Sequence, residues 1–370
     1  MKTVIIGGGA SGLACAVKIK QNNPDASVTV LEHLEQTGKK LYATGNGRCN
    51  LTNRHAANNV YVEDFFKSIG LVMRADSEGR VYPYSNQASS VPEVLSDACK
   101  KYGVQIICSC CIHETEKADN KFSIFTDKGI FTADNLVLAT GGMAQHALGS
   151  DGSGYQIAKS FGHSITPLFP ALVQLKSSSK HCRALKGVRA KCNVKIEING
   201  TAVAEEFGEL LFAEYGISGI VVMDLSHYIN DEFLKSGTEK CVAVIDFVPE
   251  MSEQQLIQHY KEFGSFIGIL PNKLCSIISR QAGGDAVLTA KYAKNWRLII
   301  TGTKGYEFAQ ITKGGVSLSE LDSNNQSLIT PNLYIAGELA DRQFKCGGFN
   351  LNNAFYDGIK IANAITKKND

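Results

Sequence analysis

The sequence predicts an α/β fold, in which a second, β-rich and helical region interrupts a domain with a parallel sheet. Three observations predict it. The chain opens with a β-branched strand, a glycine-rich turn and a helical run, in TVIIGGGASGLACAVKI. A second strand, followed by glycines and a helix, lies between residues 332 and 364. Between about 164 and 318, short alternating segments bounded by glycines and asparagines replace this pattern.

The opening turn has the glycine spacing of a dinucleotide-binding turn. Gly7 permits a tight turn, Gly9 lets the backbone approach a pyrophosphate, and Gly12 lets helix and strand pack closely. The helix that follows would direct its first amides at the phosphates. After the first helix, the next strand is predicted at 27–32 and ends in Glu32. Rossmann-like folds place at this position an acid that binds a ribose hydroxyl. This context favours a dinucleotide site over a plain glycine turn.

The composition limits the partners that we expect. The 370 residues are 44% hydrophobic, and 38 basic and 36 acidic residues leave a net charge of +2. The whole chain thus lacks the charge excess that binds nucleic acid or acidic membranes, and we expect a small-molecule substrate. No stretch approaches the roughly eighteen apolar residues of a membrane span. The sequence leaves the oligomeric state open.

The eleven cysteines are an odd, scattered set in a chain too large to need disulfides, which favours a cytoplasmic location. Three of them, Cys108, Cys110 and Cys111, fall in the strand-like run GVQIICSCCIHE, where alternate residues face opposite sides. Zinc needs about four convergent ligands, and the histidines show no HxH or HExxH spacing. We therefore predict no metal site.

Between the two strand–glycine–helix segments, the chain holds an unusual polar segment, TGNGRCNLTN, at 44–53. It is too rich in turn formers for a helix or strand, so it is either a surface loop or a loop that faces a cofactor. Its Arg48 could balance phosphate or substrate charge. Helices are expected near 61–70 and 90–102, and a buried strand at 135–140 ends in two glycines that leave room for a ligand.

The interrupting region and the end of the chain complete the predicted organisation. The region is predicted to be β-rich at 164–249 and 298–318 and helical at 250–297, where Ser252 and Gln255 form a capping box. Near the end, a strand at 332–338 leads to Gly347-Gly348 and a helix from about 350 to 364. Either this helix only packs on the sheet, or its N-terminus and glycines lie beside a ring system such as a flavin.

Several motifs resemble one family along nearly the whole chain. They are TGNGRCNLTN, GRVYPYSNQASSV, GSDGSGYQIAKSFGH, GELLFAEYGISG and AGELADRQFKCGGFNLNNAF, and they resemble the BaiN/aminoacetone-oxidase-like FAD-binding flavoproteins. The resemblance implies a discontinuous FAD-binding domain of the two-dinucleotide-binding type, residues 1–163 and 319–370, around a β-barrel-like and helical insert, 164–318. One departure is Gln343-Phe344, where the family commonly has Asp-Gly.

The resemblance also implies which residues line an extended FAD. They are, for the pyrophosphate, Gly7, Gly9, Ala10, Ser11 and Gly12; for adenosine, Glu32, His33 and Ile112; for the flavin side, Lys40, Asn46, Gly47, Arg48, Cys49, Asn50, Thr140 and Gly141; and, closing over ribityl and ring, Gly337, Glu338, Gly348, Asn350 and Leu351.

The implied function is an FAD-dependent oxidoreductase that exchanges a hydride between flavin N5 and a small-molecule substrate. Reduction of an activated double bond and oxidation of a small amine such as aminoacetone both stay open. No separate nicotinamide domain is expected, because only one GxGxxG follows a strand. NADH or NADPH could still visit the flavin as a transient electron donor. The alternative function is a non-catalytic FAD-binding redox sensor or partner-binding module. A simple NAD-dependent dehydrogenase would leave 332–364 without a task.

No catalytic acid or base is assigned. The candidates are Arg48, Tyr215, Glu338 and Cys346.

Overall fold

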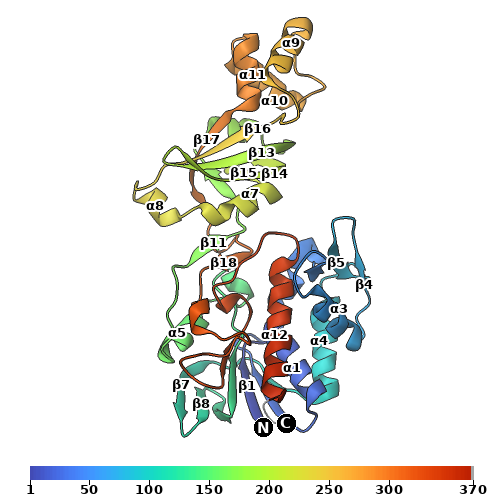
Figure 1. Ribbon diagram of the computed structural model, residues 1–370, viewed down its shortest axis with the longest axis vertical. Coiled ribbons are helices and arrows are strands. Elements are labelled where there is room, and N and C mark those ends of the chain that lie inside the picture. Colours follow the sequence, from blue (N-terminus) through green and yellow to red (C-terminus); the bar gives the residue numbers. More distant parts are fainter. Residues whose placement is uncertain (368–370) are drawn as a thin grey trace. The chain divides into compact units, whose positions relative to one another are not determined.

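The computed structural model describes residues 1–367, which form two compact units (Figure 1). Unit 1 comprises Met1–Leu168 and the chain from Ile311 onward, and unit 2 comprises Phe169–Gln310. The domain boundaries inferred above, after 163 and after 318, stay a prediction.

Unit 1 is built on a five-stranded parallel sheet, which confirms the predicted fold class. Its order is β19-β10-β1-β2-β6, so the strand from the end of the chain joins the sheet that the first strand begins. Every pair in it is parallel. The strands are β1 (Lys2–Ile6), β2 (Ser27–Leu31), β6 (Gln105–Ile107), β10 (Asn135–Leu138) and β19 (Leu333–Ile335). β10 is buried along its full length, and this is why the three residues after Asn135 are all apolar.

Two helices from opposite ends of the sequence lie side by side on this sheet, α1 (Ala10–Asn22) and α12 (Phe349–Lys367) (Figure 1). Gly358 sets their spacing, since a Cβ on it would lie 2.3 Å from the carbonyl oxygen of Ser11 and 2.9 Å from the amide of Cys15. The predicted helices at 61–70 and 90–102 are also present, as α3 (Asn59–Ser68) and α4 (Ser90–Tyr102). The close packing of α1 against α12 at Gly358 therefore joins the first and last segments of the chain.

The structure corrects two local expectations in unit 1. The run GVQIICSCCIHE is no single strand, because β6 ends at Ile107 and β7 begins at Ile112. Between them the amides of Ser109 and Cys110 donate to the carbonyls of Leu34 and Glu32, so the chain turns around the end of β2. In the polar segment, Thr52–Asn53 forms a short strand, β3, that pairs with β5.

The smaller elements of unit 1 complete its description. They are β4 (Met73–Ala75), β5 (Arg80–Pro83), β7 (Ile112–Ala118), β8 (Lys121–Thr126), β9 (Gly129–Ala133) and β18 (Ile311–Lys313), with α2 (Lys39–Tyr42), α5 (Ser153–Ser160) and the short 3₁₀ helices at 44–47, 146–148, 318–320 and 337–339.

Unit 2 is a closed antiparallel barrel with a helical addition. The barrel order is β12-β15-β14-β13-β16-β17. Its strands are β12 (Leu175–Ser177), β13 (Arg189–Ile198), β14 (Thr201–Ala213), β15 (Gly216–Ser218), β16 (Cys241–Asp246) and β17 (Trp296–Thr303), and its other elements are β11 (Phe169–Ala171), α6 (Lys180–Ala184), α7 (Ile220–Leu225), a 3₁₀ helix at 226–228 and α8 (Asp231–Lys235). The expectation of uniformly short strands is wrong for β13 and β14, which pair over ten positions.

Three helices follow β16, as predicted: α9 (Glu253–Phe263), α10 (Asn272–Gln281) and α11 (Ala286–Lys294). The capping box is confirmed, because the Gln255 amide donates to Ser252 Oγ at 3.2 Å and the Ser252 amide donates to Gln255 Oε1 at 2.8 Å. Across residues 1–367, none of the helices combines the length and apolar character that a membrane crossing requires.

We predict that Gly358→Ala lowers the free energy of unfolding by about 2 kcal/mol, because its methyl group would meet backbone atoms and force α1 and α12 apart. The roughly 1 kcal/mol helix preference of alanine is too small to compensate. Urea unfolding followed by circular dichroism measures the change. Lys18→Ala on α1 is the control and should stay within about 0.5 kcal/mol. Equal stability of Gly358→Ala and the native chain would contradict the packing argument.

Candidate cofactor site

Turns with glycines follow β1, β10 and β19 at the carboxyl edge of the sheet, the edge at which open parallel sheets bind ligands. These turns touch one another. A Cβ on Gly7, whose φ is +105°, would lie 2.4 Å from the carbonyl oxygen of Ala139 at the end of β10. A Cβ on Gly337, whose φ is +67°, would lie 2.9 Å from Ser11 Oγ. Glycine is therefore required at both positions, and the first and last turns form one surface.

Gly9 occupies the N-cap of α1, with φ −87° and ψ −162°. A Cβ on Gly9 would meet no protein atom within 4 Å, whereas a Cβ on Gly12 would lie 2.0 Å from the carbonyl oxygen of Gly7. Gly12 is thus needed to fold the turn, but Gly9 is not. Open space beside the amides and positive dipole end of a 13-residue helix fits a pyrophosphate.

Glu32 directly follows β2 and shapes the same turn. Only 7% of the residue is exposed. Its Oε2 accepts the Gly8 amide at 2.8 Å, and its Oε1 accepts the Leu34 amide at 2.9 Å and lies 3.1 Å from His33 Nδ1. Burial alone would raise the pKa of Glu32, but hydrogen bonds from His33, Leu34 and Gly8 outweigh it and lower the pKa. The carboxylate keeps lone pairs for a ribose hydroxyl.

The polar segment 44–53 is joined to the start of α12. Asn53 Nδ2 donates to the carbonyl of Gly347 at 3.0 Å, and Thr52 Oγ1 donates to Asn352 Oδ1 at 2.6 Å. Asn50 Oδ1 is buried and accepts no hydrogen bond from residues 1–367, and it lies only 2.7 Å from the position of a Cβ on Gly348. A buried oxygen without a donor is a site for a donor group on a ligand.

A charged pair connects α2 to the turn after β19. Lys40 Nζ lies 3.1 Å from Glu338 Oε2 and donates to Ser150 Oγ at 3.4 Å. Glu338 Oε1 accepts the Thr312 amide at 2.9 Å. About a quarter of each charged side chain is exposed, 27% for Lys40 and 21% for Glu338. The pair is therefore fixed by several contacts and still open to a ligand.

The other candidates on the flavin side differ in their surroundings. Arg48 is exposed, and its guanidinium lies 4.8 Å from the centre of the Tyr82 ring. Cys49 is buried, and burial raises the pKa of its thiol to about 11. Asn350 Oδ1 accepts a hydrogen bond from the backbone N–H of Phe344, and Asn350 Nδ2 donates to the Phe344 carbonyl, both at 2.9 Å. The Asn350 side chain thus closes the loop before α12.

The structure brings the predicted pyrophosphate and ribose residues to one edge of unit 1, together with most of the flavin-side candidates. Asn46 and Gly47 lie exposed in the polar loop, Thr140 and Gly141 follow β10, Ile112 begins β7, and Ala10 and Leu351 pack beside the core. Tyr215 lies in unit 2, where burial raises the pKa of its phenol and Lys304 Nζ lies 4.7 Å from its ring centre. Cys346 is half-buried before Gly347.

Several residues that hold this edge together belong to none of the predicted motifs. Thr312 supports Glu338 and accepts the amides of Met143 and Ala144, at 2.7 and 3.1 Å. Asp357 accepts the Gly337 amide at 3.1 Å from inside α12. Neither has a spacing rule that a sequence could reveal. The one available signal was a pair of opposite charges, Asp357 and Lys360, that flanks Gly358 in the helical run AFYDGIKIA.

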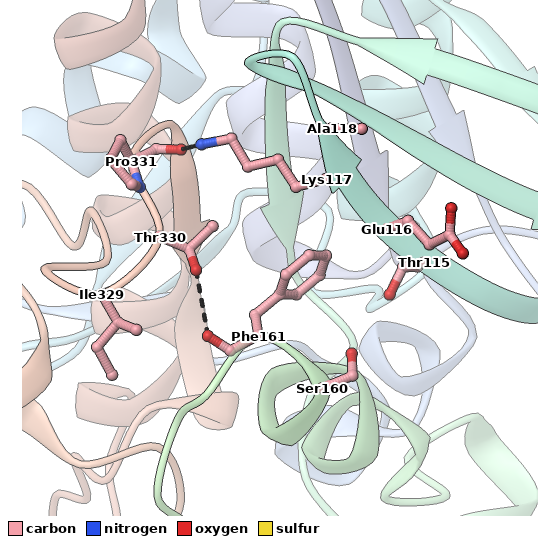
Figure 2. A pocket seen from close by; sticks show the side chains of 9 residues that line it. All are labelled: Thr115, Glu116, Lys117, Ala118, Ser160, Phe161, Ile329, Thr330 and Pro331. Carbon is pink, nitrogen blue, oxygen red and sulfur yellow. Dashed lines mark hydrogen bonds between the residues drawn. The ribbon is translucent and has the colours of Figure 1, made fainter.

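A metal centre and a surface hollow are two further kinds of site to consider, apart from the residues above. Among residues 1–367, no group of three or more His, Cys, Asp or Glu could hold a metal ion. Figure 2 shows a hollow beside β7, where Lys117 Nζ donates to the Pro331 carbonyl at 2.6 Å and Thr330 Oγ1 donates to the Phe161 carbonyl at 3.1 Å. These polar groups are already paired, and the predicted cofactor residues do not line this hollow.

We predict that Gly9→Val abolishes cofactor retention without unfolding the apoprotein, because a Cβ at this position meets no protein atom within 4 Å and the side chain would enter the space proposed for the pyrophosphate. The FAD dissociation constant should rise at least about 100-fold, or roughly 2.7 kcal/mol. Titration of the apoprotein with FAD, followed by fluorescence, measures it. Gly12→Val should instead destabilise the apoprotein itself. Stoichiometric FAD in purified Gly9→Val would overturn the assignment.

The stabilising contribution of Glu32 should depend on pH. Its pKa is lowered in the folded chain, so the contribution is complete above the unfolded value of about 4.3 and is lost as pH falls through the lower folded value. Unfolding of the native chain and Glu32→Gln at pH 7 and at pH 3 measures the difference in stability. We expect that difference to shrink at pH 3, and a constant difference would contradict the assigned shift.

Comparison with known families supports the fold. The chain matches the family described as "HI0933-like protein Rossmann domain" over residues 1–65 and 59–364. Among solved structures, a 3-ketosteroid delta1-dehydrogenase from Sterolibacterium denitrificans superposes with a TM-score of 0.55 at 12% identity, covering 99% of both chains. An open-conformation flavocytochrome c3 fumarate reductase has a TM-score of 0.54 at 13% identity, covering 99% of this chain and 78% of that one. These structures share the fold.

Curated relatives are similar over nearly their whole length. A 3-dehydro-bile acid delta(4,6)-reductase from Clostridium scindens is 35% identical, covering 98% of each chain. A ribosomal RNA dihydrouridine synthase from Haemophilus influenzae is 26% identical over 99% of each, and one from Escherichia coli is 26% identical over 94% of each. These matches confirm the resemblance read from the motifs. The chain belongs to the HI0933-like (BaiN) family of FAD-binding proteins and is an FAD-dependent oxidoreductase.

Proposed function

We propose that this chain reduces a carbon–carbon double bond conjugated to a carbonyl in a small-molecule substrate, with NADH or NADPH as electron donor. The observation that carries the proposal is the 35% identity, over 98% of both chains, to a protein named as a bile acid reductase. The names of the two dihydrouridine synthases support the same chemistry, because dihydrouridine is uridine with its carbonyl-conjugated ring double bond reduced.

The residues at the sheet edge would hold the cofactor in separate parts. The α1 N-terminus at Gly9 would bind the pyrophosphate, and Glu32 would accept hydrogen bonds from the adenosine ribose. Lys40 and Glu338 would lie on the flavin side, where they offer one cation and one acceptor. When bound, FAD supplies reversible two-electron hydride chemistry, and the protein supplies position and electrostatics.

Arg48 is the residue that we assign to the substrate carbonyl. A guanidinium stays protonated in proteins, so it can polarise a carbonyl oxygen by hydrogen bonding but does not deliver the proton. Contact with the Tyr82 ring limits the positions that this exposed side chain can take. The overall reaction consumes one hydride and one proton per double bond, and water is the proton source that needs no further residue.

The alternatives differ in substrate. Names of two relatives refer to ribosomal RNA, whereas the net charge of +2 over 370 residues gives this chain no overall attraction for a polyanion. Oxidation of a small amine is the other outcome that the test below distinguishes.

The first test is an anaerobic absorbance spectrum of the purified protein before and after NADH or NADPH, followed by addition of an acceptor. We expect rapid bleaching by one nicotinamide and recovery of the yellow colour by a planar, conjugated ketone of the steroid type. Recovery with unmodified ribosomal RNA alone would favour the RNA substrate. A flavin that only aminoacetone reduces would favour an amine oxidase, and a flavin that neither nicotinamide reduces would refute NADH and NADPH as the electron donor.

We predict that Arg48→Ala lowers kcat/KM for the conjugated ketone by about 100-fold, the usual effect of removing one donor to a developing oxyanion. Bleaching by the nicotinamide should keep its rate, because that step does not involve the substrate carbonyl. Stopped-flow measurement of the two half-reactions separates them. Arg54→Ala, another exposed arginine of unit 1, is the control. An unchanged rate of ketone reduction in Arg48→Ala would refute the role.

A further inference from the structure

A buried carboxylate lies directly behind the turn that follows β19. Asp357 is fully buried in α12. Its Oδ2 accepts the Gly337 amide at 3.1 Å and Asn353 Nδ2 at 3.2 Å. Two cations face its Oδ1, Arg342 Nη1 at 3.0 Å and Lys360 Nζ at 3.7 Å. Burial raises the pKa of Asp357 and the two cations oppose the increase, so the carboxylate depends on them.

The two cations connect Asp357 to different parts of the chain. Lys360 lies three residues further along the same helix, so its ion pair joins two neighbouring positions of α12. Arg342 lies in the segment 341–348, which we call the 341–348 loop, between the 337–339 turn and α12. Its guanidinium crosses from this loop to the helix. Of these two ion pairs, only the Arg342 pair reaches from the loop to α12, where it adds to the hydrogen bonds that Asn350 and Asn53 make with the loop.

The 341–348 loop carries the residues that distinguish the predicted flavin side. It contains Gln343 and Phe344, the departure from the resembled family, and ends in Gly347-Gly348. The Gly347 carbonyl accepts Asn53 Nδ2 at 3.0 Å, and Gly348 lies against the unpaired Oδ1 of Asn50. A displacement of the loop would therefore move both the glycine pair and the polar segment that contacts it.

We propose that Arg342 is a positioning residue, which holds the 341–348 loop on α12 through Asp357 and so fixes the glycine pair and Phe344 on the flavin side. The proposal rests on the proposed function for the identity of that side. Asp357 couples the restraint to the Gly337 amide, so the turn after β19 and the loop are held by one carboxylate.

Arg342→Met and Lys360→Met form a matched pair, because each removes one cation beside Asp357. Hydrogen–deuterium exchange of the full-length apoprotein reports on the amides of the loop. We expect exchange at least about tenfold faster in Arg342→Met, which corresponds to a loss of about 1.4 kcal/mol in protection, and unchanged exchange in Lys360→Met. Arg342→Lys should restore part of the protection, since lysine keeps the charge without the planar fork.

The second readout of the Arg342 proposal is the FAD dissociation constant, measured by titration of the apoprotein with FAD. We expect the dissociation constant to rise about tenfold in Arg342→Met and to stay within about twofold in Lys360→Met. If Arg342→Met does not fold, Arg342→Gln, which keeps an amide donor for Asp357, takes its place with the same thresholds.

Three outcomes would overturn the proposal or part of it. Equal loop exchange in the methionine variants would mean that Arg342 contributes only charge, and the positioning role fails. Faster exchange with unchanged FAD affinity would overturn the link to the flavin side. A native chain that binds no FAD would refute the proposed function and with it that link, while the exchange experiment on the apoprotein still decides whether Arg342 restrains the loop.

Discussion

The candidate site depends on the close packing of α1 against α12. Gly358 lets these helices approach until a side chain on one would touch the backbone of the other, and Gly337 lets the turn after β19 approach Ser11 in the same way. Such contacts tolerate little displacement, because protein interiors are packed as densely as organic crystals. As a result, a helix from the start of the chain and a turn from its end, more than 300 residues apart, form one surface at the carboxyl edge of the sheet.

Polar contacts complete what packing begins. Glu32 fixes the glycine turn through the Gly8 amide, and Thr312 holds Glu338 in reach of Lys40. Each of these side chains is engaged on one side and still offers charge or lone pairs to a ligand. This arrangement suits a cofactor whose parts differ in charge, because the helix N-terminus attracts phosphate while a carboxylate accepts hydroxyl groups. In the hollow in Figure 2, by contrast, Lys117 and Thr330 already donate to backbone carbonyls.

Many of the strands, helices and turns could be predicted from the sequence, namely those that are determined by neighbouring residues. The strands of the sheet follow from β-branched and apolar runs, α9 follows from a capping box, and the dinucleotide turn follows from glycine spacing. The break at Cys108 could not be predicted, because the turn there depends on the carbonyls of Glu32 and Leu34, which follow β2 and lie far away in the sequence. For the same reason β3 was missed, since its two residues are a strand only through pairing with β5.

The sequence by itself determined the fold class and the family, because these depend on periodicity, on turn chemistry and on motifs that stay together along the chain. The bounds of the insert and the residues that hold the cofactor stay predictions from the same motifs. Only the tertiary structure decided that Gly9 is dispensable for folding while Gly12 is not, that Asn350 closes a loop, and that Asp357 joins Gly337 to Arg342. The physical reason is that these roles are set by which atoms meet across the fold, and distances between segments far apart in sequence leave no pattern in the order of the residues.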